Sequence, residues 1–531
     1  MAKRRQASSG KKSGGKRGGT PPTRRPPAKP APKAAAKSAA RPRAEQGLDE
    51  ARWLLSGLGL ILAVTFLRLG INAFEWLPVH FDEAQYWAYG QELAWGYYSK
   101  PPGVGAVIRV TTDLGGDTLF SLRLSSPLAH ALIAIGLLTL GKRMFDAQTG
   151  FWAAAAYTAA PGVTVSSMIV STDPVMMVPW VLGMIAWLRA SETGHWRDWA
   201  LLGVFIGLGT LAKYTMLAMP AGLIGYALFS ARGRDLRGAA IAAAAAAAVL
   251  SPNLAWNAAN GFATVTHVAE DADPGQGYFN IVDFLEFAGA QLGVIGPVIF
   301  IAILIAFWRR QDWIGDWRMR MLAWQTGLLL FAMLLLAFLT RAQPNWAAPA
   351  YVAGSLFAAR WLIMVGAGRM LRLQLGLGAI AGIAAYGMAS LYAGGQAETL
   401  LRATDPYKKT RIGEPFCSRA LAAMQEEGAE VMLSWDRRRL SECMFIGGLS
   451  WDEIAVWNPE ITAQNHHELV ATLQPGDERL MLLAVMGPRD PEVVAGAFED
   501  ARLVDEGRFA THRDRDYGFS LWVVQGFRGY P

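Results

Sequence analysis

The feature that most constrains this chain is a succession of apolar stretches between residues 53 and 394, each near the roughly 20 residues that cross a bilayer as a helix. A backbone in lipid has no water to hydrogen-bond, so each stretch is expected to be helical. Eleven spans are expected, the two around Lys213 short enough to be one broken hairpin: 53–74, 119–140, 150–170, 174–190, 198–212, 214–230, 238–256, 287–308, 321–340, 344–364 and 373–393. With 52% hydrophobic and 18% charged residues, the sequence predicts an α-helical polytopic membrane protein.

The positive charge of the chain is confined to one end. The formal charge is +7, but residues 1–44 alone contain 14 Lys/Arg and no Asp/Glu, so the remainder sums to −7. This excludes a basic binding face on the folded body, and the tail lacks the interleaved aromatics of a nucleic-acid binder. We expect residues 1–47 to be a disordered, retained cytoplasmic tail that is either simply solvated or drawn to anionic lipid headgroups.

The short loops give the expected orientation. With the N-terminus inside, fifteen Lys/Arg fall on the cytoplasmic side and six on the outer side, and an odd number of spans places the C-terminus outside. After a membrane domain at 48–395, residues 396–531 alternate strand-length apolar runs with helix-like pieces, which predicts a small soluble α/β domain. Its two cysteines, Cys417 and Cys443, either pair or remain separate buried thiols.

The first outer loop, residues 75–118, contains the most unusual stretch. Asp82 and Glu83 begin a segment expected to form a helix lying flat on the membrane surface, with these aromatic rings at headgroup level: Tyr86, Trp87, Tyr89 and Trp95. At such a helix start Asp82 could act as a base or a metal ligand; the alternative is an ordinary acidic first turn.

Four further charged residues stand at the outer ends of the expected spans. Lys100 is held by two following prolines, Asp173 precedes a span, Lys213 separates two apolar runs and Arg341 follows a span. Each alone is explained by helix capping or a snorkelling side chain. Together with Asp82 they are expected to surround one outward-facing cavity.

At this point the sequence resembles a known family, the polytopic glycosyltransferases of family 39 and the aminoarabinose lipid A transferases of the GT-C superfamily. Six segments carry the resemblance, in order and at family-like spacing over residues 45–395: FDEAQYW, YYSKPPG, STDPVMM, AKYT, SPNLAWNAANGFATVTH and QPNWAAPAY. The C-terminal NHHELVATL is similar to the outer domain of bacterial members but less diagnostic.

The resemblance implies a GT-C fold and transfer of a sugar from a polyprenyl-phosphate donor to an envelope acceptor, a lipid A-like glycolipid being favoured. It implies that Asp82 is the general base, that Lys100 contacts the lipid-linked phosphate and that Asp173 shapes the same cavity. The remaining residues that it implies are Lys213, Arg341 and His267 near the donor headgroup, and Glu83, Tyr98 and Asn257 in support.

One position departs from the pattern, because Ser99 stands where aminoarabinose transferases can carry an acid. We therefore predict no essential metal and no other cofactor, with a divalent cation left as an open alternative. Direct displacement of the phosphate by the acceptor predicts inversion at the anomeric carbon. The expected partners are the donor, the acceptor and membrane lipids, without nucleic acid, and the expected location is the inner membrane with a periplasmic C-terminal domain. Two alternatives are a protein O-mannosyltransferase-like activity and a lipid-sugar transporter or flippase.

Overall fold

A computed structural model describes residue 15 and residues 43–264, 266, 279–487 and 491–531. Contacts divide the chain into two compact units, Met1–Gln46 and Gly47–Pro531, and the second contains both the membrane helices and the C-terminal sheet. The expected disorder of the basic tail concerns residues that lie almost wholly outside the described ones.

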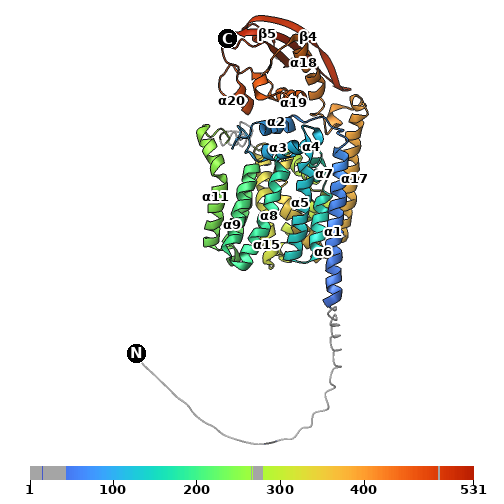
Figure 1. Cartoon of the computed structure of the whole chain (residues 1–531). Helices are drawn as coiled ribbons and strands as arrows, with labels where there is room; N and C mark the ends of the chain where they lie inside the picture. Colours follow the sequence, from blue (N-terminus) through green and yellow to red (C-terminus); the bar gives the residue numbers. More distant parts are fainter. Residues whose placement is uncertain (1–14, 16–42, 265, 267–278, 488–490) are drawn as a thin grey trace. The chain divides into compact units, whose positions relative to one another are not determined.

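The membrane part consists of helices that run side by side (Figure 1). Small residues allow close approach where α9 meets α11: a Cβ on Gly203 would lie 2.1 Å from the carbonyl oxygen of Ala242, and one on Gly207 would lie 2.6 Å from Val249. The helices are α1 (Arg43–Asn72), α4 (Leu119–Arg123), α5 (Ser125–Met144), α6 (Ala147–Thr158), α7 (Pro161–Ser166), α8 (Thr172–Thr193), α9 (Trp196–Ala212), α10 (Ala218–Leu228), α11 (Leu236–Ala259), α13 (Ile281–Val294), α14 (Pro297–Trp308), α15 (Trp317–Leu339), α16 (Ala350–Met364) and α17 (Arg369–Ala393).

Fewer helices have the length of a full span than the eleven expected. Within the described residues six are long and apolar enough to cross a membrane, and a seventh is possible if α13 and α14, bent by 118°, count as one. The other expected stretches are helical but shorter. Prolines or a charge interrupt them: α7 starts anew at Pro161, α9 ends before the extended Lys213, and a 3-10 turn at Pro344–Ala347 precedes α16.

The loop at residues 75–118 forms two helices, α2 (Phe81–Gln91) and α3 (Gly103–Gly115). The expectation that its aromatic rings lie at headgroup level was wrong for three of the four. Tyr86, Trp87 and Tyr89 are 7%, 3% and 0% exposed, and only Trp95, at 57%, is open. The C-terminal domain covers Trp87 and Tyr89, whose rings lie 5.4 Å from Phe445 and 5.1 Å from His466. A sequence pattern cannot distinguish lipid headgroups from a covering protein domain, since both accept amphipathic rings.

The C-terminal domain is built on a five-stranded mixed sheet of order β2-β1-β3-β5-β4. β1 lies parallel to β2 and β3, whereas β5 is antiparallel to β3 and β4. Its strands and helices are β1 (Val431–Ser434), β2 (Ile454–Val456), β3 (Met481–Met486), β4 (Phe498–His512), β5 (Arg515–Phe527), α18 (Gly413–Glu427), α19 (Arg437–Gly447), α20 (His466–Ala471) and α21 (Pro491–Ala495).

The apolar runs expected to be strands form β1, β3 and β5. One helix-like piece, residues 490–501, behaves differently, because the helix ends at Ala495 and strand β4 begins at Phe498. Helix α19 of the C-terminal domain packs against α2. The C-terminal domain and the first loop therefore share one buried core.

A buried ion pair fixes α2 to the membrane helices. The Glu83 carboxylate accepts hydrogen bonds from Arg123 Nε at 3.0 Å and Arg123 Nη2 at 2.8 Å, and from the backbone N–H of Val170 at 2.8 Å and of His80 at 3.0 Å. Both side chains are almost fully buried, at 1% and 3% exposure. Arg123 also donates to the carbonyl oxygens that precede α2, those of Leu77 and Pro78, at 2.9 Å each.

This geometry ties three segments together: the start of α2, the short helix α4 and the turn before α8. A desolvated ion pair is tolerated only when such bonds satisfy both partners, and removal of one partner leaves a buried charge uncompensated. Glu83, expected as a supporting residue of the site, thus positions the loop that carries Asp82.

We expect Arg123→Met to lower the free energy of unfolding by about 3–5 kcal/mol, because the Glu83 charge then has no partner. The matched control is Arg143→Met, which breaks an ion pair to Glu192 whose side chains are 38% and 36% exposed and should cost no more than about 1 kcal/mol. Denaturant titration of the purified protein in detergent measures both. Equal losses for the two variants would show that the Glu83–Arg123 pair does not hold the loop.

Candidate active site

A cavity of about 630 Å³ opens where the first loop meets the membrane helices. Five of the residues that the sequence singled out line it: Asp82, Glu83, Lys100, Asp173 and Lys213. They come from the start of α2, the turn before α3, the start of α8 and the end of α9. Residues that are far apart in the sequence, from Asp82 to Lys213, thus place two lysines and three carboxylates around one cavity.

Asp82 lies in the first turn of α2 without acting as its cap. The cap is His80, whose Nδ1 accepts the Asp82 N–H at 3.2 Å and whose own N–H is bound by Glu83. Capping, the ordinary explanation for an acid at this position, therefore does not engage the Asp82 carboxylate. That side chain is 49% exposed, and its Oδ2 lies 3.7 Å from His80 Nδ1.

The neighbouring imidazole leaves this carboxylate available. Burial lowers the pKa of His80, although the charges of Asp82 and Glu83 oppose the shift. His80 is thus uncharged near neutral pH and does not neutralise Asp82.

Lys100 projects into the cavity from a tight turn. The backbone N–H of Tyr97 donates to the Lys100 carbonyl at 2.9 Å, and the Lys100 N–H donates to the Tyr97 carbonyl at 3.4 Å. Gly103, which begins α3, touches the end of α9 so closely that a Cβ there would lie 2.8 Å from Ala212 Cα. This close approach places the Lys100 turn next to the end of α9, which Lys213 follows.

Asp173 and Lys213 form an ion pair inside the cavity. Lys213 Nζ lies 2.7 Å from Asp173 Oδ1, and Asn345 Nδ2 donates to Asp173 Oδ2 at 2.8 Å. The two charged side chains are only 8% and 18% exposed, so water screens them little. Sequence reasoning did not single out Asn345, although the quoted segment QPNWAAPAY contains it.

The remaining predicted residues lie elsewhere. Arg341 is exposed and does not line the cavity, so the expected group of five is a group of four. Asn257 is buried in α11, where its Nδ2 donates to the Asn253 carbonyl at 3.0 Å, and Tyr98 is likewise absent from the lining. His267 lies outside the described residues.

The structure adds a cation that the sequence did not suggest. Lys409, from the segment before the C-terminal domain, also lines the cavity and lies 6.0 Å from the centre of the Phe81 ring. Arg438 of α19 lies 5.0 Å from the same ring. Two basic side chains thus stand beside the residue that precedes Asp82. An exposed lysine in a polar segment gives no sequence signal that distinguishes it from an ordinary surface residue.

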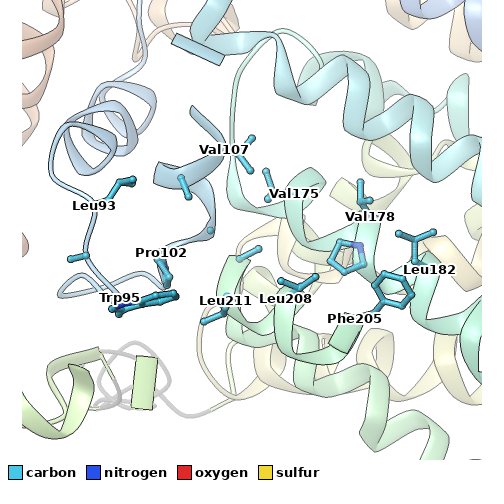
Figure 2. A pocket seen from close by; sticks show the side chains of 15 residues that line it. Leu93, Trp95, Pro102, Val107, Val175, Val178, Leu182, Phe205, Leu208 and Leu211 are labelled. Carbon is cyan, nitrogen blue, oxygen red and sulfur yellow. The ribbon is translucent and has the colours of Figure 1, made fainter. Parts of the chain in front are cut away.

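A second cavity, of about 600 Å³, adjoins the first and is entirely apolar in its lining residues. Figure 2 shows Leu93, Trp95 and Pro102 of the first loop opposite Val178 and Phe205 of the membrane helices. We call this second cavity the apolar groove. Pro102, Val175 and Ala212 of its lining lie within two residues of Lys100, Asp173 and Lys213 of the polar cavity.

Among the described residues there is no group of three or more His, Cys, Asp or Glu side chains placed to hold a metal ion.

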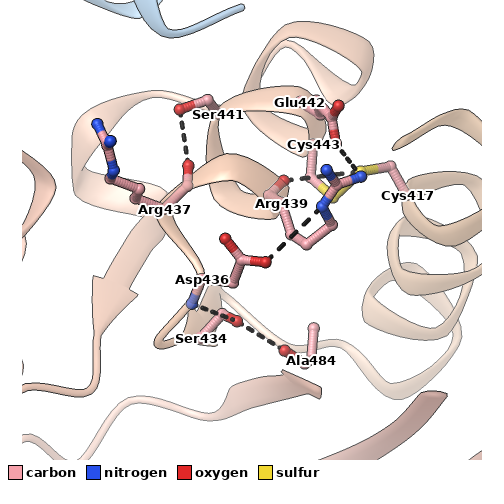
Figure 3. Close-up of a disulfide and its surroundings, with 9 residues drawn as sticks. All are labelled: Cys417, Ser434, Asp436, Arg437, Arg439, Ser441, Glu442, Cys443 and Ala484. Carbon is pink, nitrogen blue, oxygen red and sulfur yellow. Dashed lines mark hydrogen bonds and ion pairs between the residues drawn. A yellow bond between two sulfur atoms is a disulfide. The ribbon is translucent and has the colours of Figure 1, made fainter. Parts of the chain in front are cut away.

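A disulfide stiffens the part of the C-terminal domain that covers α2. Cys417 of α18 is bonded to Cys443 of α19, which settles the alternative left open by the sequence in favour of pairing (Figure 3). Beside it, Arg439 pairs with Glu442 inside the domain. α19, the helix that contacts α2, is therefore cross-linked to its own domain.

Comparisons with known proteins show which family the chain resembles. A family model described as dolichyl-phosphate-mannose-protein mannosyltransferase matches residues 99–256. The chain is 33% identical over 392 residues to the lipid A galacturonosyltransferase RgtD of Rhizobium johnstonii, which covers 73% of this chain and 82% of that protein. It is 27% identical over 352 residues to an undecaprenyl phosphate-alpha-4-amino-4-deoxy-L-arabinose arabinosyl transferase of Pseudomonas aeruginosa, covering 61% of this chain and 60% of the relative.

The fold resembles a solved structure. ArnT from Cupriavidus metallidurans in the apo state superposes with a TM-score of 0.57 at 12% identity, over 89% of this chain and 98% of that one. The same protein bound to undecaprenyl phosphate gives 0.56 at 14% identity, over 88% of this chain and 98% of that one. These matches, and the relative at 33% identity, confirm the resemblance stated from the motifs. The chain is a multi-pass membrane protein that belongs to the polytopic GT-C glycosyltransferases, together with the lipid A sugar transferases.

Proposed function

We propose that this enzyme transfers a sugar from a polyprenyl-phosphate carrier to a lipid A-like glycolipid on the outer side of the inner membrane, with inversion. The observation that carries the proposal is the polar cavity shared by Asp82, Lys100 and the Lys213–Asp173 pair, next to the apolar groove. The names of the relatives support it, since one acts on lipid A and another uses an undecaprenyl phosphate-linked sugar.

The two parts of the site match the two parts of the donor. A polyprenyl phosphate has an anionic head and a long hydrocarbon tail, and a head among Lys100 and Lys213 leaves the tail beside Pro102 and Ala212 at the groove.

The reaction needs a base and a cation in separate places. As the acceptor oxygen forms its bond to the anomeric carbon, the bond from that carbon to the phosphate oxygen breaks and the phosphate gains a negative charge. Lys100 stabilises that charge in a chamber that water screens poorly, with the Lys213 ammonium nearby. Asp82 accepts the proton of the acceptor hydroxyl. Direct displacement on the face opposite the phosphate inverts the anomeric centre.

We assign the acceptor to the rim of the cavity near Asp82. Lys409 and Arg438 flank Phe81 there, at 6.0 and 5.0 Å from the centre of its ring. Cations at this place suit an anionic glycolipid better than a neutral hydroxyl of a protein. A protein acceptor, which the description of the family model suggests, remains the alternative that the acceptor assay tests.

We expect Asp82→Asn and Lys100→Ala each to reduce kcat by about 10²- to 10³-fold, because each removes a group that acts in the transition state. The assay uses protein in liposomes with polyprenyl phosphate carrying galacturonic acid or aminoarabinose, and with lipid A or a hydroxyl-bearing peptide as acceptor. The control is Asp113→Asn, which alters an exposed carboxylate in the same loop, paired with Arg109 at 2.7 Å.

Full turnover by either variant would remove the assigned role of that residue. Flipping of the labelled donor lipid by wild-type protein without any sugar transfer would instead support a transporter.

We expect Ala106→Phe to weaken binding of a long-chain donor about tenfold, because a ring at this position occupies the volume of the groove that the chain would fill. A donor with a short prenyl chain should bind the variant and the wild type equally. Leu201→Phe, at a 44% exposed position outside the groove lining, is the control. Equal KM values of the Ala106→Phe variant and the wild type for the long-chain donor would exclude the groove as the tail site.

We further propose that the N-terminus is cytoplasmic and that the cavity and the C-terminal domain face the periplasm. Lys/Arg bias in the loops supports this orientation, and the Cys417–Cys443 disulfide suits an oxidising compartment.

We expect Glu92→Cys in the first loop to react with an impermeant maleimide in right-side-out vesicles, and Arg310→Cys, between α14 and α15, to react only in inverted ones. Both positions are exposed, and both native cysteines are bonded, so background labelling is low. The reverse pattern would place the cavity on the cytoplasmic side, away from the proposed acceptor.

A further inference from the structure

The motif NHHEL of the C-terminal domain is not used by the proposed reaction, yet it reaches the first loop. Asn465 caps α20 by accepting the N–H of Glu468 at 3.2 Å, which directs His466 toward the loop. The His466 ring meets the rings of Tyr89 and Tyr97 edge-on, at 5.1 and 5.0 Å with interplanar angles of 89° and 88°. His466 is only 8% exposed, so solvent is largely excluded from this contact.

The two tyrosines form a rigid unit. Their rings stack at 4.1 Å with an interplanar angle of 6°, and the Tyr97 hydroxyl donates to the Tyr89 carbonyl at 2.6 Å. The backbone N–H and carbonyl groups of Tyr97 also form the two hydrogen bonds to the backbone of Lys100 that close the turn. A shift of the Tyr97 ring therefore moves the backbone from which the Lys100 side chain extends.

The ring of Trp451 also packs against His466. Trp451 meets it edge-on at 5.6 Å, and the Trp451 indole N–H donates to the Ala88 carbonyl of α2 at 3.1 Å. The neighbouring His467 lies 3.0 Å from the Ser441 hydroxyl, which fixes α20 to α19. We call the four side chains Tyr89, Tyr97, Trp451 and His466 the aromatic latch.

We propose that His466 is a positioning residue for the transfer reaction: through the aromatic latch, the C-terminal domain holds the turn that presents Lys100 to the donor phosphate. This inference rests on the proposed function only in assigning the phosphate to Lys100. The C-terminal domain then has a role in catalysis beyond covering the membrane part.

Ring packing, rather than hydrogen bonding, explains the role of the imidazole. His466 Nδ1 is buried without a hydrogen-bond partner among the described residues, and burial lowers the pKa of this histidine to about 4. A neutral flat ring of similar size should therefore replace it, whereas a small side chain should not.

The test compares His466→Ala with His466→Phe in the reconstituted enzyme. We expect the alanine variant to raise KM for the polyprenyl-phosphate sugar about tenfold with a much smaller change in kcat, and the phenylalanine variant to restore KM. His195→Ala, at an exposed histidine before α9, is the control. If the alanine variant does not fold, His466→Leu removes the aromatic ring with less loss of volume.

A second readout does not require sugar transfer. Modification of Lys100 by an amine-specific reagent, followed by mass spectrometry, reports how the lysine is presented, and added undecaprenyl phosphate should protect it in the wild type. We expect weaker protection in the alanine variant and wild-type protection in the phenylalanine variant. A wild-type KM and wild-type protection in the alanine variant would overturn the latch. Altered Lys100 protection in an enzyme that transfers no sugar would instead support the latch and overturn the proposed function.

Discussion

The arrangement of the whole site depends on the buried ion pair between Glu83 and Arg123. Its bonds join the start of α2, the helix α4 and the backbone at Val170 before α8. These segments carry Asp82 and Asp173, so the pair sets the distance between the proposed base and the second acid of the cavity. Other contacts of α2 are with α3, with Asp117, to which Trp87 Nε1 donates at 2.6 Å, and with the C-terminal domain, where Arg437 donates to Gln85 at 2.9 Å.

Like the proposed donor, the site has a charged part and an apolar part. Charged groups gather in one chamber, whereas the groove beside it is lined by apolar side chains alone. On three segments, residues one or two positions apart line the two cavities, for example Lys100 and Pro102. Such a boundary fixes the depth of an amphiphile, because neither its head nor its tail gains by moving into the other chamber.

The sequence predicted the parts of the site whose local context is unusual. Asp82, Lys100, Asp173 and Lys213 are charged residues at the edges of apolar runs, and all four line the cavity. Asn345 was missed because its bond to Asp173 joins residues 172 positions apart, and no local pattern reports such a contact. The roles of Lys409 and His466 likewise depend on how the C-terminal domain lies over α2. The sequence located the apolar stretches and marked the break at Lys213, but apolar composition did not show that α7 starts anew at Pro161.

The central claim is that the polar cavity and the apolar groove are the head and tail sites of one lipid-linked donor. The most direct measurement is a cryo-EM structure of the wild-type protein with undecaprenyl phosphate. The account predicts phosphate density within hydrogen-bond distance of Lys100 Nζ, in the chamber that contains Asp82, with chain density leaving past Trp95 and Leu208. Phosphate density outside that chamber, with the groove unoccupied, would contradict it.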